Sequence, residues 1–75
     1  MRFEYSDFYR KMGLNIAYYR KDRGLTQKAL ADALNIDESH LSKIERASVG
    51  VSLDMLFDIA HELDIQASKL LEFRE

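Results

Sequence analysis

The chain has 75 residues, enough for one small domain, and a domain of this size buries only about 60% of the surface of its unfolded chain. Hydrophobic residues make up 47% of the sequence, proline is absent, and the apolar residues recur at helical spacing, so we expect an all-α fold. The absence of cysteine excludes a disulfide framework and a thiolate metal site, and the net charge of −2 shows that the chain as a whole is not basic.

The first five residues, which we treat as an N-terminal arm (residues 1–5), lack the apolar core of a signal peptide. No apolar run approaches the roughly 20 residues that cross a bilayer. We therefore expect a cytoplasmic protein that does not associate with a membrane.

The first expected helix begins near Ser6, a candidate N-cap, and ends at Gly24, because glycine readily adopts the positive φ that often follows a helix. Gly13, inside this helix, indicates close packing against another helix. The expected inward face carries Phe8, Met12, Ile16 and Tyr19.

Two short helix patterns follow, joined by a tight turn. Thr26 is placed to cap the first pattern, and Asn35 tolerates the positive φ that the turn requires. The small Ala31 permits a close crossing of the two helices. The apolar face of the first pattern consists of Leu30, Ala31 and Leu34.

The second pattern has Asp37 as its candidate N-cap and Leu41 and Ile44 on its core face. Its remaining positions are polar, which leaves the opposite face free to contact another molecule. The combination over residues 26–46 predicts a helix-turn-helix motif. The alternative is an ordinary helical hairpin, which requires the apolar spacing alone.

A connection at residues 48–51 leads to a fourth expected helix, capped by Ser52. Its inward face is expected to carry Leu53, Leu56, Ile59, Ala60 and Leu63, and every fourth residue on the opposite side is acidic, at Asp54, Asp58 and Glu62. A last short helix from about Ala67 to Phe73, with Leu70 in the core, makes about five helices.

Aromatic residues near the N-terminus could stack on bases, but their helical spacing favours a core or an interface. Four further apolar residues exceed what one small core covers and are candidates for a dimer surface: Phe57, Ile65, Leu71 and Phe73. An equally simple alternative is that these four close the back of the monomer.

The chain resembles the Cro/CI-type (Xre) family of bacterial and phage helix-turn-helix regulators over about Met12 to Leu71. The matches lie in every expected helix: Gly13, Ile16, Arg20, Gly24-Leu25-Thr26-Gln27, Leu30-Ala31, Leu34, Leu41-Ser42, Ile44-Glu45-Arg46, Ser52-Leu53, Leu56, Ile59-Ala60, Leu63 and Leu70-Leu71. The resemblance implies a single compact, five-helix, lambda-repressor-like domain over residues 1–75. In length the chain is also similar to the controller proteins of restriction-modification systems.

This resemblance further implies a homodimeric transcriptional regulator, such as a repressor, that binds a pseudo-palindromic operator in double-stranded DNA. The second helix of the motif would lie in the major groove and read bases with Asp37, Glu38, Ser39, Ser42 and Lys43. Lys43 suits guanine, and Glu38 can accept from the amino group of cytosine.

Contacts to the DNA backbone are implied for Thr26, Gln27, Lys28, His40 and Arg46. A residue that contacts phosphate alone weakens all sequences alike when it is removed, and this is the behaviour expected of Gln27→Ala. The resemblance also implies a structural salt bridge between Arg20 and Glu45. We expect no cofactor and no metal, because no second ligand accompanies His40 at a suitable spacing.

Some residues depart from the family pattern. Ala47 replaces the usual glycine after the recognition helix, Val51 replaces a proline, and Ser48-Val49 stand where many relatives are basic. The acidic pair Asp37-Glu38 would repel phosphates. Either the protein reads C-rich half-sites or the domain has lost DNA binding.

Residues 51–75 hold six acidic and two basic side chains, so the acidity is concentrated outside the motif. The alternative function is a protein-interaction module, for example an antitoxin or antirepressor component with a protein partner and weak or no DNA binding. An enzyme is not expected, because the chain has no cysteine, no glycine-rich phosphate loop and no paired histidine ligands.

Overall fold

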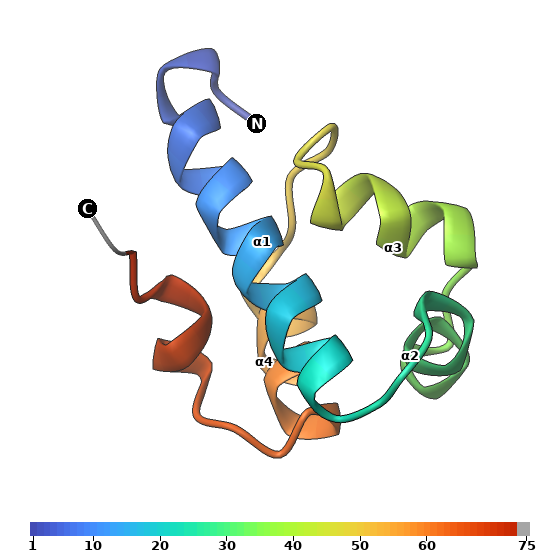
Figure 1. The fold of residues 1–75 in the computed structure, drawn as a ribbon. Helices are drawn as coiled ribbons and strands as arrows, with labels where there is room; N and C mark the ends of the chain where they lie inside the picture. Colours follow the sequence, from blue (N-terminus) through green and yellow to red (C-terminus); the bar gives the residue numbers. More distant parts are fainter. Residues whose placement is uncertain (74–75) are drawn as a thin grey trace.

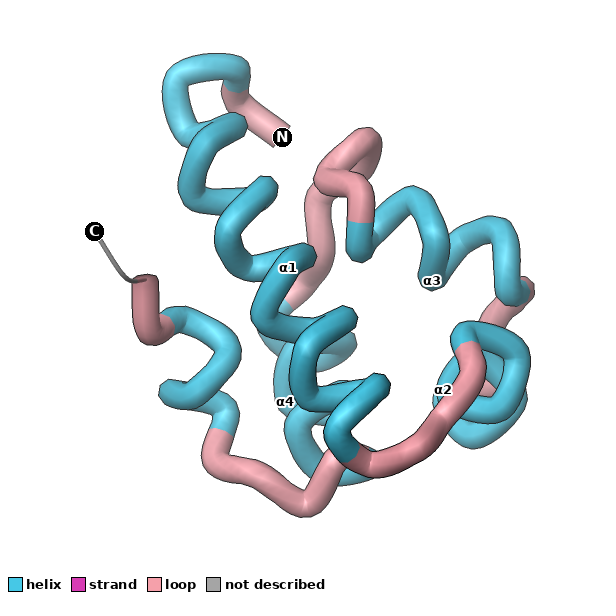
Figure 2. Tube along the Cα trace, viewed as in Figure 1, coloured by secondary structure: helices cyan, strands magenta, loops and turns pink. Residues whose placement is uncertain are grey.

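The computed structural model describes residues 1–73, which form helices and connecting loops and no strand (Figure 2). The elements in chain order are the 3-10 helix η1 (Phe3–Tyr5), the α-helices α1 (Ser6–Asp22), α2 (Gln27–Leu34), α3 (Glu38–Glu45) and α4 (Leu53–Glu62), and the 3-10 helix η2 (Ala67–Leu71). The all-α prediction is confirmed. The last expected helix is a 3-10 helix that ends at Leu71 rather than an α-helix that reaches Phe73.

Helix α1 runs through the middle of the molecule, with α2 and α3 on one side and η2 on the other (Figure 1). Helix α4 lies behind and contacts α2 and η2. The buried apolar side chains form one cluster: Met12, Ile16, Leu30, Ala31, Leu41, Ile44, Leu56, Ile59, Ala60, Leu63 and Leu70. Within the described residues, no helix has both the length and the apolar character needed to cross a membrane.

The prediction of an inward-facing side chain is wrong for two residues, Leu53 and Phe8. Leu53 is 65% exposed, because the buried stripe of α4 starts at Leu56 and leaves Leu53 and Phe57, four residues apart, together at its outer edge. Phe8 is 50% exposed. It lies in the first turns of α1, ahead of the buried part of that helix, and its ring stacks between Tyr5 and Phe73 at centroid distances of 6.3 and 5.8 Å.

Side-chain caps begin α2 and α4 as predicted. The hydroxyl oxygens of Thr26 and Ser52 accept from backbone amides three residues later, at 3.0 and 3.1 Å. The prediction for Ser6 is wrong, since the N-cap of α1 is Tyr5 and η1 leads directly into the helix. Asp37 occupies the N-cap position of α3 but makes no side-chain capping bond.

All four α-helices end in the same backbone motif. The residue after the last turn has positive φ, 71° at Gly24, 59° at Asn35, 58° at Ala47 and 56° at Asp64. The next amide donates to the carbonyl five residues earlier, as Leu25→Arg20, Ile36→Ala31, Ser48→Lys43 and Ile65→Ala60. The sequence predicted this ending at Gly24 and Asn35 only.

Candidate nucleic-acid interface

The outward face of α3 is open to solvent. Leu41 and Ile44 point into the core, while Asp37, Glu38, Ser39, His40 and Lys43 are exposed and Ser42 is half-buried. No part of the described chain covers this face. The helix therefore presents a polar surface that is available to another molecule.

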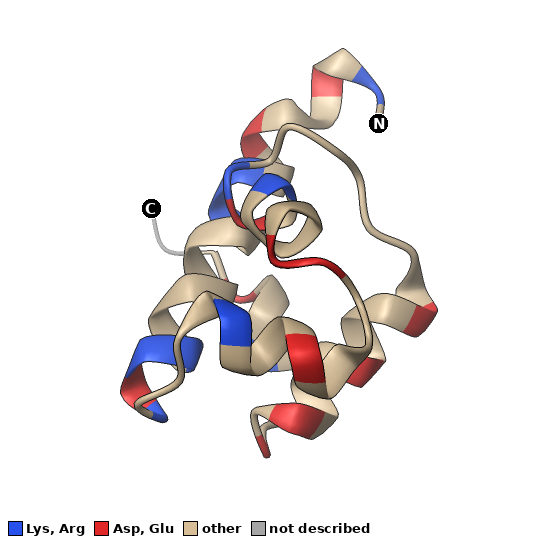
Figure 3. Cartoon of the chain, turned by 90° about the vertical axis from the view of Figure 1, so that its right-hand side faces the viewer, with Lys and Arg blue, Asp and Glu red and all other residues tan. Residues whose placement is uncertain are grey.

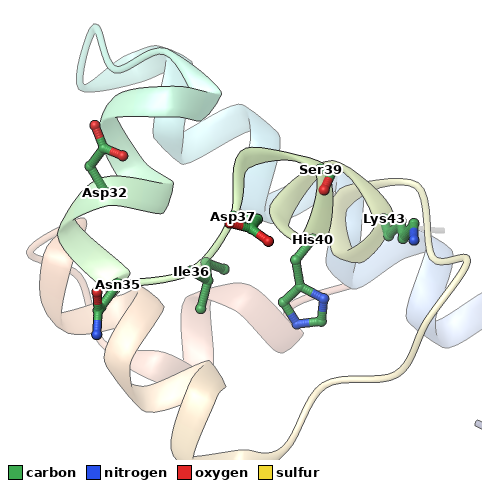
Figure 4. A pocket seen from close by; sticks show the side chains of 7 residues that line it. All are labelled: Asp32, Asn35, Ile36, Asp37, Ser39, His40 and Lys43. Atoms are coloured by element: carbon green, nitrogen blue, oxygen red, sulfur yellow. The ribbon is translucent and has the colours of Figure 1, made fainter.

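An open hollow of about 640 Å³ lies between the end of α2 and the start of α3. It brings together three of the predicted base-reading residues and His40, but not Glu38 or Ser42. Figure 4 shows His40 and Lys43 along α3, with Asp32 and Asn35 across from them at the end of α2. The lining residues are Asp32, Asn35, Ile36, Asp37, Ser39, His40 and Lys43.

Asp32 was not predicted to belong to this surface. A signal for it exists in the sequence, because Asp32 lies four residues after Lys28 and the two therefore share the outer face of α2. In the structure Lys28 Nζ lies 3.4 Å from Asp32 Oδ2. This exposed ion pair partly neutralises a lysine expected to contact phosphate.

The start of α2 has an N-terminal cap and unpaired backbone amides. Thr26 caps the helix through its oxygen, which leaves its hydroxyl hydrogen free to donate to another group. Gln27 and Lys28 follow in the first turn, where unpaired backbone amides and the helix dipole favour negative charge.

The predicted ion pair between Arg20 and Glu45 is present and buried. Arg20 Nε donates to Glu45 Oε2 at 2.8 Å and Arg20 Nη2 donates to Oε1 at 3.2 Å, which is bidentate geometry. Arg20 Nη1 also donates to the carbonyl oxygen of Leu25, at 2.8 Å, in the loop between α1 and α2. One guanidinium thus holds α1, that loop and the last residue of α3 together.

Gln27 joins the same carboxylate, which the sequence did not predict. Its Nε2 donates to Glu45 Oε1 at 3.0 Å, so Glu45 accepts from both α1 and α2. Within the described residues, every buried side-chain nitrogen and oxygen has a hydrogen-bond partner. The sequence does not predict this bond, because the two residues are 18 positions apart and Gln27 is already expected to contact phosphate at the helix N-terminus.

Gly13 explains how α3 comes close enough to α1. A Cβ placed on Gly13 would lie 2.3 Å from the carbonyl oxygen of Glu45, far inside van der Waals contact with a backbone atom. The close packing predicted for this glycine is confirmed. The end of α3 therefore rests directly on the backbone of α1.

The far end of α3 carries Lys43 in its last turn and Arg46 as its C-cap. Arg46 is exposed, and its Nε donates to the carbonyl oxygen of Ser42 at 3.4 Å. Ala47 takes the left-handed conformation, so α3 ends as it would with glycine. Helices α2 and α3 carry both Lys and Asp or Glu, whereas α4 carries Asp and Glu but no Lys or Arg (Figure 3).

The predicted dimer residues differ in exposure. Phe57 and Leu71 are 53% and 48% exposed, while Ile65 packs against the core. Leu71 and Phe73 line an apolar groove of about 400 Å³. The other residues along this groove are Phe8, Tyr9, Met12, Val51, Ser52, Leu53 and Leu56.

A family model described as helix-turn-helix (HTH_3) matches residues 16–70, which is most of the chain. The chain belongs to this helix-turn-helix family. The match contains all of α2, α3 and α4, and it confirms the Cro/CI-type resemblance.

Relatives in this family include DNA-binding transcriptional regulators. The chain is 40% identical over 60 residues to the immunity repressor protein of Bacillus phage phi105, a match that covers 80% of this chain and 42% of that protein. This chain thus spans less than half the length of that curated relative.

Two solved structures are similar over nearly their whole length. The restriction-modification controller protein C.AhdI from Aeromonas hydrophila has a TM-score of 0.85 and 30% identity, covering 89% of this chain and 97% of that chain. The master regulator for biofilm formation SinR, solved in complex with DNA, has a TM-score of 0.76 and 32% identity, covering 81% and 98%.

Proposed function

We propose that this protein is a sequence-specific DNA-binding transcriptional regulator that inserts α3 into the major groove. One observation carries the proposal: the outward face of α3 is polar and uncovered, while the opposite face and the last residue are locked onto α1 through Arg20 and Glu45. A helix that reads bases needs both an exposed side and a rigid support. Because DNA is the ligand, we expect the protein to act in the cytoplasm.

Different parts of the motif contact the DNA backbone and the bases. Phosphate contacts fall to the first turn of α2, through Thr26, Gln27, Lys28 and the helix amides, with His40 and Arg46 adding to them. Base contacts fall to Asp37 at the N-cap of α3 and to Glu38, Ser39, Ser42 and Lys43 along the helix, of which Ser42 is half-buried. The acidic start of α3 favours cytosine, whose amino group donates to a carboxylate.

We further propose a homodimer on a pseudo-palindromic operator, with recognition helices about 34 Å apart. A monomer with a net charge of −2 makes few phosphate contacts, and pairing doubles them. The surface proposed for pairing is the apolar groove, which Leu71 lines, together with the exposed Phe57. Ile65 takes part less, because it is packed against the core.

The decisive experiment is in vitro selection of bound duplexes followed by an anisotropy titration at several salt concentrations. The proposal predicts micromolar or tighter binding to the selected sequence, with affinity falling as salt rises. Equal affinity for the selected and an unrelated duplex would reject sequence-specific regulation.

The alternative is a protein-interaction module, and one observation favours it. Helix α4 carries Asp54, Asp58 and Glu62 but no Lys or Arg, and Ser48 and Val49 add no positive charge after α3. Capture of a stoichiometric protein partner by a chain that does not bind any duplex would support this reading.

A further inference from the structure

The hydrogen bond between Gln27 and Glu45 joins the two functional ends of the motif. Gln27 is the first residue of α2, where phosphate is expected, and Glu45 is the last residue of α3, which is expected to read bases. The two atoms, Gln27 Nε2 and Glu45 Oε1, are 3.0 Å apart. Because the Glu45 side chain is only 6% exposed and is also held by Arg20, this bond anchors Gln27 to a rigid part of the protein.

Gln27 has one amide hydrogen left for DNA. A glutamine amide carries two N–H donors, one of which is engaged by Glu45, and the residue is only partly buried. A phosphate oxygen at the start of α2 can accept the second hydrogen. The Gln27 side chain can then donate one hydrogen bond to a phosphate and one to Glu45 at the end of α3.

We propose that Gln27 is a positioning residue that couples the phosphate contact of α2 to the orientation of α3, and so contributes to sequence specificity. This inference rests on the proposed function. Lys43 lies two residues before Glu45, so a rotation of the last turn of α3 moves its ammonium relative to a base edge. Non-specific binding tolerates such a rotation, whereas hydrogen bonding to a base does not.

The test uses Gln27→Met, which keeps the side-chain length and removes both donors, with Lys28→Ala as the matched control. Lys28 is the neighbouring phosphate candidate, and its side chain pairs with Asp32 on its own helix. Anisotropy measures the ratio of affinities for the selected and an unrelated duplex. We expect Gln27→Met to lower this ratio about tenfold and Lys28→Ala to leave it unchanged while weakening both affinities.

A rescue variant separates positioning from general loss of structure. Gln27→Lys supplies an ammonium that can donate to both Glu45 and a phosphate, so the affinity ratio should return toward that of the unmodified protein. Circular dichroism establishes that each variant is folded. If Gln27→Met does not fold, the affinity ratio of Gln27→Lys is the test. A Gln27→Lys ratio well below that of the unmodified protein overturns the coupling.

The outcomes distinguish the two proposals. Should the unmodified protein bind both duplexes equally, the proposed function fails and the inference fails with it. If it discriminates but Gln27→Met weakens both duplexes by one common factor, Gln27 is a phosphate contact alone, and the inference is wrong while the proposed function stands.

Discussion

Ala47 holds a backbone conformation that its side chain disfavours. Its φ is 58°, in the left-handed region where an L-residue with a Cβ is strained by about 1 to 2 kcal/mol. The motif still forms, because the amides of Ala47 and Ser48 donate to the carbonyls of Ile44 and Lys43 at 3.1 and 2.9 Å. The hydrogen bonds that end α3 therefore offset the strain.

We expect Ala47→Gly to raise the free energy of unfolding by about 0.5 to 1 kcal/mol, since removing the Cβ relieves strain and the more flexible unfolded chain offsets part of the gain. Urea denaturation measures it. Ala33→Gly is the matched control, because Ala33 lies inside α2 and the same change there should cost about 1 kcal/mol. The same sign for both substitutions would contradict this account.

Gly13→Ala should destabilise the protein. The new Cβ would meet the carbonyl oxygen of Glu45 at 2.3 Å, and a backbone atom yields only if α3 shifts. Overpacking costs about 1 to 3 kcal/mol, less about 1 kcal/mol gained in helix propensity. Gly50→Ala is the control, with its nearest neighbour an ordinary 3.5 Å away, and thermal unfolding compares the two. A Gly13→Ala variant that melts clearly above the Gly50→Ala variant would rule out a close approach at Gly13.

At the scale of elements, α3 is joined to the rest of the fold by its core residues Leu41 and Ile44 and by the buried ion pair of Glu45 with Arg20. Removing the guanidinium leaves the Glu45 carboxylate buried without its main partner, which typically costs about 3 to 5 kcal/mol. We therefore expect Arg20→Met to lower stability by about that amount in denaturant titrations. The double variant Arg20→Met, Glu45→Met should recover much of it, because no unpaired charge remains.

A smaller loss would change the interpretation of this pair. If Arg20→Met alone costs less than about 1 kcal/mol, the bonds of Arg20 to Glu45 and Leu25 do not hold the elements together. The support of α3 would then come from the core residues Leu41 and Ile44.

Helix α3 offers one cation on its outward face, Lys43, which lies beside His40 in the hollow. We expect Lys43→Ala to relax base preference at one position and to cost about 1 to 3 kcal/mol on the selected duplex. Competition with duplexes changed at single positions measures it. A uniform loss at every position would assign Lys43 to phosphate instead.

At the scale of the whole molecule, a small domain leaves much apolar surface uncovered. The groove between α1, α4 and η2 is lined almost entirely by apolar residues, among them the half-exposed Leu71, and Phe57 on α4 is also exposed. Exposed apolar patches of this kind mark interaction sites. A second copy would cover this surface and add a second recognition helix.

Leu71→Asp should therefore shift the protein toward monomer in sedimentation experiments and weaken operator binding at the same concentration. A charge in the proposed contact loses apolar burial and adds a desolvation cost. Leu14→Asp is the control, because Leu14 is 56% exposed on α1 and lies outside the groove. Identical sedimentation of the two variants would exclude this surface from pairing.

The sequence by itself determined the helical class, the helix-turn-helix spacing, the caps at Thr26 and Ser52 and the left-handed turn at Asn35. Each of these depends on residues a few positions apart, whose hydrogen bonds form within one helical turn. The pairing of Arg20 with Glu45 came from family resemblance rather than from local chemistry.

Only the tertiary structure decided the bond from Gln27 to Glu45, the strained end of α3 at Ala47, and the exposure of Leu53 and Phe8. These features depend on which segments meet in space. An amphipathic helix can carry more apolar residues than its contact with the core buries. A glutamine side chain can hydrogen-bond to any of several neighbouring groups. Packing between distant segments selects among them, and neither spacing nor propensity contains that choice.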